Sequence, residues 1–382
     1  MNTKYMQDYA RDSFFTSTLF FIYFWSYLFF LMLDRFFILG SLVVSFCITF
    51  LMMPTGIRLL RKYRMGKQIR EEALMGKAEE FSRLHSHKTG TPTMGGIFVI
   101  ISVIIVTLLS ILIQNLGSWM DISLGFSFKY SLWNRNETYI ALFTLVSVGC
   151  IGLIDDYLNV REIGRTKGLS ARVKMILLIL FAFVWAYWFY TKLGYSSIHI
   201  PFFGWVDIGM WYIPLFILVL VSTANSVNIT DGLDGLAGWL LLFSYTIYAV
   251  IAYSKGLHIL AAFCLIIVGA LIAFLWFNIK PAQVIMGDVG SLSLGATLAV
   301  IAFMTDTLVV LIIVGGIFVF ETLSVILQLL SKRLRNGKKI FRIAPYHHHL
   351  EAIGWKEETI VMRFWLIGMI LAVIWLSIWL IR

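Results

Sequence analysis

The sequence predicts an all-α protein that crosses a membrane about ten times. Of its 382 residues, 59% are hydrophobic and only 14% are charged, and the mean hydropathy is +0.85, which is far from a soluble globular composition. Apolar runs of roughly 17 to 25 residues, the length that a helix needs to cross about 30 Å of hydrocarbon, recur along the whole chain. Continuous runs such as "MILLILFAFVWAYWFY" lack the alternation of a β-barrel strand. We therefore expect a polytopic helical bundle.

The apolar runs locate the expected spans. These lie at about 36–53, 95–114, 138–154, 174–192, 209–224, 236–254, 258–277, 291–304, 307–330 and 361–380. A further run, residues 14–33, is either an eleventh span or an interfacial helix, and no small-residue cleavage site follows it, so no removable signal peptide is expected. The chain thus divides into an N-terminal extension, 1–35, and one membrane domain, 36–382. The loop 193–208 alternates like a short β-hairpin.

The distribution of Lys and Arg predicts the orientation. The net charge is +10, and the cations gather in alternate loops, at 58–88, 161–174, 280 and 332–356. By the positive-inside rule these loops face the cytoplasm and the C-terminus lies outside. Because this rule accounts for the charge, no nucleic-acid partner is expected. The three cysteines, Cys47, Cys150 and Cys264, lie in apolar runs, so no disulfide is expected.

Unusual polar residues gather in five motifs on the cytoplasmic side, and the first two adjoin apolar runs. In "KTGTPTMGG", residues 88–96, a threonine could cap a helix, while exposed N–H groups and Lys88 suit a phosphate; a plain helix cap explains this motif equally well. Asp155 and Asp156 end an apolar run. Since neighbours on a helix point about 100° apart, one acid is expected to act as base or ligand and the other to orient it. The alternative, two solvated acids, is weakened by the helix macrodipole, which disfavours acids at a C-terminus.

The third motif is "SVNITDGLDGLAG", residues 226–238. Asn228, Asp231 and Asp234 are spaced by three, so a helical turn would bring them to one face. No Lys or Arg lies in the motif, so its acids need a metal, a nucleobase or distant lysines as partners. Structural capping alone is the alternative.

The fourth and fifth motifs follow later in the chain. Asp288 lies between Gly287 and Gly290 just before a span, where a tight turn could aim its carboxylate into a site. In "APYHHHLE", residues 344–351, three consecutive histidines cannot all face one point, which argues against zinc and favours pyrophosphate binding by one or two of them. Carboxylates beside phosphate-binding cations favour Mg²⁺.

One acid lies inside a predicted span. Glu321 follows Gly315 and Gly316 in the run "GGIFVFETLSVILQ". A buried acid is costly, so Glu321 requires a partner or a groove, and the two glycines could break the helix.

The five motifs, in this order and on this side, closely resemble those of the phospho-N-acetylmuramoyl-pentapeptide transferases of bacterial cell-wall synthesis, which belong to the polyprenyl-phosphate N-acetylhexosamine-1-phosphate transferases. The resemblance rests on "GTPTMGG", "DDY", "NITDGLDGLAG", "MGDVGSLSLG" and "APYHHHLE", and runs from about residue 36 to the C-terminus. It implies ten helices with both termini outside, and a cytoplasmic catalytic groove beside a split ninth helix.

The resemblance also implies a reaction and its partners. Phospho-N-acetylmuramoyl-pentapeptide would pass from UDP-MurNAc-pentapeptide to undecaprenyl phosphate, forming lipid I and releasing UMP, with Mg²⁺ as cofactor. The protein would act as a homodimer in the bacterial cytoplasmic (inner) membrane, with its active site facing the cytoplasm.

The resemblance assigns roles residue by residue. Asp288 and Asp231 would hold the metal, Asp155 would deprotonate or position the lipid phosphate, and Asp156 and His347 would assist catalysis. The residues expected to bind substrate are Lys88, Thr93, Lys167, Asn228, Asp231, Asp234, Gly287, Gln328, Ala344, His348 and His349. Asn159 departs from the family, since many relatives carry a lysine near that position. Direct attack by the lipid phosphate and a two-step route through an aspartyl phosphate are both left open.

Three other functions fit the sequence less well. The first is a sister enzyme that transfers N-acetylglucosamine-1-phosphate, but the motif "APYHHHLE" favours the muramoyl-pentapeptide enzyme. A membrane prenyltransferase needs a third acid shortly after its aspartate pair, where this chain has Asn159. A transporter would carry ionisable groups along the middle of several spans, and only Glu321 is clearly of that kind.

Overall fold

The computed structural model describes residues 37–66, 72–73, 76–77, 88–124, 132, 136–164 and 168–381. The predicted N-terminal extension, with its run 14–33, and the predicted phosphate contact Lys167 lie outside the described residues.

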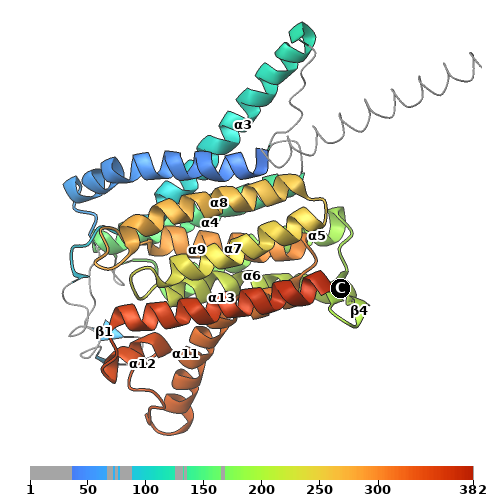
Figure 1. Cartoon of the computed structure of the whole chain (residues 1–382). Coiled ribbons are helices and arrows are strands. Elements are labelled where there is room, and N and C mark those ends of the chain that lie inside the picture. Colours follow the sequence, from blue (N-terminus) through green and yellow to red (C-terminus); the bar gives the residue numbers. More distant parts are fainter. Residues whose placement is uncertain are drawn as a thin grey trace, which may run out of the picture.

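Within this part of the chain, nine helices are long and apolar enough to cross a membrane, and a sharply bent pair of helices forms one further apolar segment. The helices lie side by side in one bundle (Figure 1). They are a first helix, Phe37–Lys62, then α3 (Gly96–Leu124), α4 (Asn136–Val160), α5 (Ala171–Lys192), α6 (Tyr212–Thr230), α7 (Leu236–Ser254), α8 (His258–Asn278), α9 (Gly287–Met304) and α13 (Glu357–Ile381). The prediction of a polytopic α-helical membrane protein is confirmed.

The first helix continues past its predicted end. Its apolar run was expected to stop at residue 53, but the helix reaches Lys62. Arg58, Arg61 and Lys62 in the added turns are exposed, so this end of the helix continues where charged side chains are solvated. Hydropathy indicates the length of chain in hydrocarbon, which is shorter than the helix itself.

The bent pair consists of α10 (Leu308–Val314) and α11 (Gly316–Leu334), whose axes differ by 77°. The break falls at Gly315, which confirms the expected interruption at the two glycines. Figure 1 shows α11 leaving the bundle at a steep angle to the other helices. A short helix, α12 (Tyr346–Ala352), follows and packs against α11.

Two hairpins connect helices. β3 (Ser197–Ile200) pairs antiparallel with β4 (Gly204–Asp207), which confirms the hairpin predicted in the loop 193–208. A 3₁₀ turn, η2 (Gly209–Trp211), leads from β4 into α6. β1 (Glu72–Ala73) and β2 (Gly76–Lys77) form a smaller antiparallel pair.

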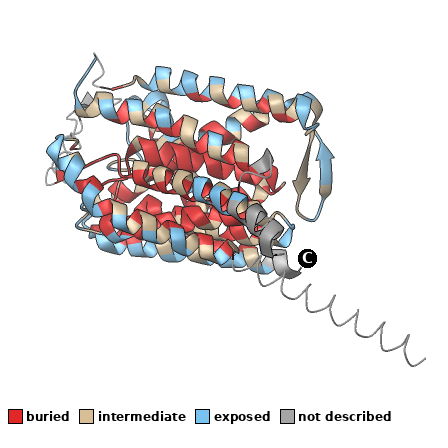
Figure 2. Cartoon of the chain, turned by 90° about the horizontal axis from the view of Figure 1, so that it is seen from above, coloured by how far each residue is buried: buried red, intermediate tan, exposed pale blue. Residues whose placement is uncertain are grey.

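α9 is the centre of the bundle. Of the residues that form its span, 89% are buried, whereas the share for α5 is 22%. Figure 2 shows the buried residues concentrated in the middle of the bundle. The most extensive contacts of α9 are with α4 and α6. Each of these two helix contacts contains a glycine at which a Cβ would collide with the backbone of the other helix. A Cβ at Gly152 of α4 would lie 2.6 Å from Val289 N, and one at Gly295 of α9 would lie 2.8 Å from Ala224 Cα.

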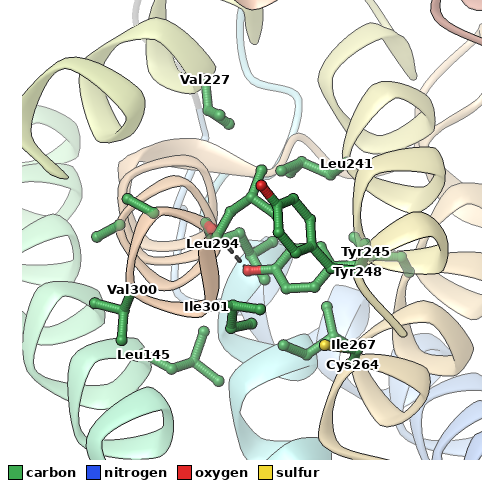
Figure 3. Packing of buried hydrophobic residues seen from close by; sticks show 14 of the residues in the cluster. Leu145, Val227, Leu241, Tyr245, Tyr248, Cys264, Ile267, Leu294, Val300 and Ile301 are labelled. Carbon is green, nitrogen blue, oxygen red and sulfur yellow. Dashed lines mark hydrogen bonds between the residues drawn. The ribbon is translucent and has the colours of Figure 1, made fainter. Parts of the chain in front are cut away.

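A buried tyrosine of this core is hydrogen-bonded to the central helix. The Tyr245 hydroxyl of α7 donates to the Leu294 carbonyl of α9 at 2.7 Å, and Tyr248 and Cys264 lie close by (Figure 3). All three cysteines are free, as expected; Cys264 is buried, whereas Cys47 and Cys150 are exposed.

Candidate active site

An open pocket of about 160 Å³ lies at the end of the bundle where α4 and α6 finish and α9 begins. Four of the five predicted motifs meet there or next to it. The lining residues are Thr93, Asp156, Asn159, Val160, Asn228, Asp231, Ile285, Gly287 and Asp288. The structure thus brings together residues that are almost two hundred positions apart in the chain.

A lysine joins two of the predicted acids. Lys174, in the first turn of α5, forms ion pairs with both Asp155 and Asp288. Asp155 also accepts a hydrogen bond from Leu169 N at 2.7 Å, and Asp288 accepts one from Asn228 Nδ2 at 2.7 Å. Since two carboxylates repel each other, the shared ammonium lowers the cost of holding them close together.

Asp156 has a different partner from its neighbour. Its Oδ2 accepts a hydrogen bond from Val289 N at 3.1 Å, in the first turn of α9. A carboxylate at this end of a helix is favoured by the free N–H groups and the macrodipole. Gly287, at φ +75°, lies against the same carboxylate. Asp156 therefore ties α4 to α9, while Asp155 faces Lys174.

The third motif does not form one helical face. Because α6 ends at Thr230, Asp231 lies in the turn that follows and lines the pocket, as Asn228 does. Asp234 points elsewhere: its Oδ1 lies 2.7 Å from Lys88 Nζ and its Oδ2 accepts from Ala282 N at 3.1 Å. The expectation of a shared face is therefore wrong for Asp234.

Lys88 and Asp234 belong to a buried ionic network. Glu357, at the start of α13, pairs with Lys88, lies 3.1 Å from Lys280 Nζ, and accepts from Asp234 N at 2.8 Å. Burial lowers the pKa of Lys280, but hydrogen bonds and charges from Glu357 and Glu358 outweigh burial and raise it above its usual range. This network joins the loop before α3, the turn after α6 and α13 beside the pocket.

The histidines of the fifth motif do not all face one point, as expected: His347 and His348 lie side by side, and His349 faces the loop between α11 and α12. His347 is fully buried. Its backbone N–H donates to Glu321 Oε1 at 3.2 Å, and its ring Nδ1 lies 3.1 Å from Glu321 Oε2. Glu321 thus has the partner that its place in an apolar run required. His348 Nδ1 lies 2.7 Å from Glu351 Oε2. Both imidazoles pack against Gly232, so this motif adjoins the turn that carries Asp231.

Gln328 and His349 hold the loop between α11 and α12. Gln328 Oε1 accepts from Ile340 N at 2.9 Å and from Phe341 N at 3.0 Å, and its Nε2 donates to the Phe341 carbonyl at 2.8 Å. His349 Nδ1 accepts from Arg342 N at 3.2 Å. Ala344 directly precedes Pro345, the N-cap of α12. In the structure these residues shape the loop, and the pocket lining does not include them.

Lys174, Lys280 and Glu357 belong to these clusters but are absent from the predicted site. The two lysines are predicted only as part of the cytoplasmic charge, and Glu357 has no predicted role. For Lys174 the signal is its position as the first residue of the predicted span 174–192, where a cation can pair with acids at the ends of neighbouring spans. No comparable signal distinguishes Glu357 from a helix-capping acid.

The oxygen donors of the pocket suit a hard cation. Within the described ranges, no three His, Cys, Asp or Glu side chains converge as a metal site. Asp231 and Asp288 both line the pocket, however, and Mg²⁺ is commonly held by one or two carboxylates, with waters and substrate phosphates completing the shell. The donor set therefore fits Mg²⁺ bound together with a phosphorylated substrate.

A bundle of apolar helices with a pocket of carboxylates, an amide and a nearby lysine at one end defines a membrane-embedded enzyme suited to phosphorylated substrates. The family described as "Glycosyl transferase family 4" matches residues 138–306. The chain is 39% identical to a phospho-N-acetylmuramoyl-pentapeptide-transferase of Geobacillus sp. (strain WCH70), over 89% of this chain and 97% of the relative. It is 41% identical to the enzyme of that name from Clostridium novyi (strain NT), over 87% of this chain and 94% of the relative. The chain belongs to the phospho-N-acetylmuramoyl-pentapeptide-transferase family.

Proposed function

We propose that the protein transfers phospho-N-acetylmuramoyl-pentapeptide from UDP-MurNAc-pentapeptide to undecaprenyl phosphate, which forms lipid I and releases UMP. Membership of the family supports the donor. The observation that carries the chemistry is the pairing of Asp155 and Asp288 through Lys174 beside a polar pocket at the end of the bundle. At that end a lipid phosphate and a water-soluble nucleotide have access to the same residues.

The proposed transfer is a displacement at phosphorus. An oxygen of the lipid phosphate attacks the β-phosphorus of the donor, a new P–O bond forms, and the bond to UMP breaks. A phosphate monoester is largely ionised at neutral pH, since its second pKa is about 6, so Asp155 orients the nucleophile more than it deprotonates it. Lys174 offsets the repulsion between this carboxylate and the incoming phosphate.

Mg²⁺ is part of the proposal. Asp288 and Asp231 would hold it, and it would supply positive charge to the pyrophosphate as UMP departs. Asn228 keeps Asp288 oriented through its amide hydrogen bond. Chelation with EDTA is expected to stop the reaction, and added Mg²⁺ to restore it.

A two-step route uses the same residues and has a separate signature. If an aspartate first took the phosphosugar, UMP would appear in the absence of lipid acceptor, at up to one equivalent per protein. Direct attack releases no UMP until the acceptor is added.

The cellular setting is proposed from charge. The loops at the pocket end carry most of the Lys and Arg, so this end faces the cytoplasm in the bacterial inner membrane. A homodimer remains a prediction, which the mass of the purified protein in detergent would check.

The test is UMP release by the purified protein given UDP-MurNAc-pentapeptide, undecaprenyl phosphate and Mg²⁺. We expect Asp155→Asn and Asp288→Asn each to abolish it, and UDP-N-acetylglucosamine to fail as donor. Release with UDP-N-acetylglucosamine but not with the muramoyl donor would establish the sister activity. Wild-type rates in either variant would refute the role given to that residue.

A further inference from the structure

The helix α11 has an inverted distribution of polar and apolar residues. Its polar side chains Glu321, Ser324, Gln328 and Ser331 are buried against the loop and α12. The neighbouring, exposed side of the helix is an apolar stripe at helical spacing that is 45% to 76% exposed, formed by Phe320, Leu323, Leu327, Leu330 and Leu334. In water such an exposed apolar stripe would favour aggregation, so it requires an apolar partner.

The direction of α11 indicates what that partner is. The helix is bent by 77° from α10 and leaves the bundle at a steep angle to the spanning helices (Figure 1). A helix in this orientation runs closer to the membrane plane than to its normal. With one apolar side and one polar side, α11 has the form of a helix that lies in the interface of a bilayer.

The end of α11 carries a dense positive charge. Arg333, Arg335, Lys338 and Lys339, which we term the basic turn, are all exposed. No ion pair joins any of them to another described residue. No acid occurs between Glu321 and Glu351 in the sequence, so nothing nearby in the chain offsets this charge.

We propose that the stripe and the basic turn together bind anionic phospholipid of the cytoplasmic leaflet, with acyl chains against the stripe and headgroup phosphates on the four cations. Cations next to an apolar face match the order of charge and hydrocarbon in a lipid monolayer. A nucleic acid or an acidic protein would match the cations but not the stripe. The lipid is a structural ligand, distinct from the acceptor that the proposed function consumes.

The proposal gives α11 a second role. Its polar side holds His347 through Glu321 and the loop through Gln328, while its apolar side is held by lipid. The helix therefore lies between the bilayer and the histidine motif.

The test reads lipid beside α11 directly and needs no transfer reaction. Leu334→Cys, 76% exposed at the end of the stripe, is labelled with a fluorophore in full-length protein whose three native cysteines are replaced by serine. The protein is reconstituted in phosphatidylcholine vesicles containing a few per cent of either doxyl-labelled phosphatidylglycerol or doxyl-labelled phosphatidylcholine. Quenching by the two lipids gives their local ratio beside the helix.

We expect the phosphatidylglycerol label to be enriched at least about fivefold, the preference that a single well-placed cation gives, and the enrichment to fall with added salt. Arg333→Gln/Arg335→Gln/Lys338→Gln/Lys339→Gln should bring the ratio within twofold of one. A matched control, Arg58→Gln/Arg61→Gln/Lys62→Gln/Arg64→Gln, removes four exposed cations from the first helix and the residues after it, and should leave the ratio unchanged.

Three outcomes would overturn the proposal. Absence of quenching by both lipids would mean that α11 lies outside the bilayer. Equal quenching in wild type would mean no preference for anionic lipid. An equal loss of preference in the two quadruple variants would assign it to the total cytoplasmic charge. Because neither donor nor acceptor is present, none of these outcomes depends on the proposed transferase activity.

Discussion

Substituting Gly287 with alanine separates backbone strain from displacement of a site residue. Gly287 has φ +75°, and a Cβ there would lie 2.5 Å from Asp156 Oδ2 and 2.9 Å from Thr93 Oγ1. The left-handed backbone costs a non-glycine residue roughly 1–2 kcal/mol. The contact with Asp156 is about 1 Å too short, so the carboxylate must move by a similar distance. A displacement of about 1 Å in an active site can cost roughly 100-fold in rate.

The chain offers a matched control. Gly256 has the same φ of +75°, but a Cβ there would meet nothing within 4 Å. We expect Gly256→Ala to lower the free energy of unfolding by about 1–2 kcal/mol and Gly287→Ala to lower it further, because the new Cβ also displaces Asp156 from Val289 N; thermal melting in detergent gives the order. Only Gly287→Ala should lower UMP release by about 100-fold. Equal rates in the two variants would show that the position of Asp156 does not matter for the reaction.

Three further substitutions test single contacts. Lys174→Met keeps the length of the side chain but removes the ammonium shared by two carboxylates, so the rate of UMP release should fall by about 100-fold or more. Lys174→Arg should retain part of that rate. A Met variant within tenfold of the wild-type rate would contradict the role given to the ammonium. Glu321→Leu leaves the backbone N–H of His347 without its acceptor and should destabilise the fold by about 1–3 kcal/mol. Glu321→Gln should melt close to wild type and still lose activity. Equal activity of the Gln variant and wild type would show that the charge of Glu321 is unimportant. The pKa of Lys280 is raised above the ordinary value of 10.5, so its pairing with Glu357 contributes fully to folding stability below pH 10.5, and this contribution is lost as pH rises through the raised pKa. Lys280→Met should therefore be less stable than wild type at pH 8, with a difference in stability that shrinks above pH 11.

Most of the fold could be predicted because a bilayer imposes a length on each apolar run. The nine spans of the described residues, the hairpin and the break at Gly315 follow from hydropathy, alternation and the glycine pair. Helix ends were harder to predict, since the helix that ends at Lys62 continues after the apolar run stops.

The site was predictable to the level of its motifs, but not of its contacts. Local spacing put Asp234 beside Asp231, yet one turn after α6 directs Asp234 to Lys88, which is 146 positions away. Lys174 had the charge of an ordinary cytoplasmic cation, and only the tertiary fold brings it to Asp288. Pairings between distant segments depend on how helices pack, which a single sequence does not display.

The glycine contacts of α9 also bear on how the protein tolerates different membranes. At Gly152 and Gly295 the neighbouring helices touch α9 backbone to backbone, so α9 can neither slide nor rotate without a collision. The depth of Asp288 is therefore set by the protein and not by the thickness of the surrounding lipid. In a thinner or thicker bilayer, we expect hydrophobic mismatch to be taken up by the tilt of an outer helix such as Phe37–Lys62, of which only 28% is buried, and the carboxylate to keep its place in the pocket.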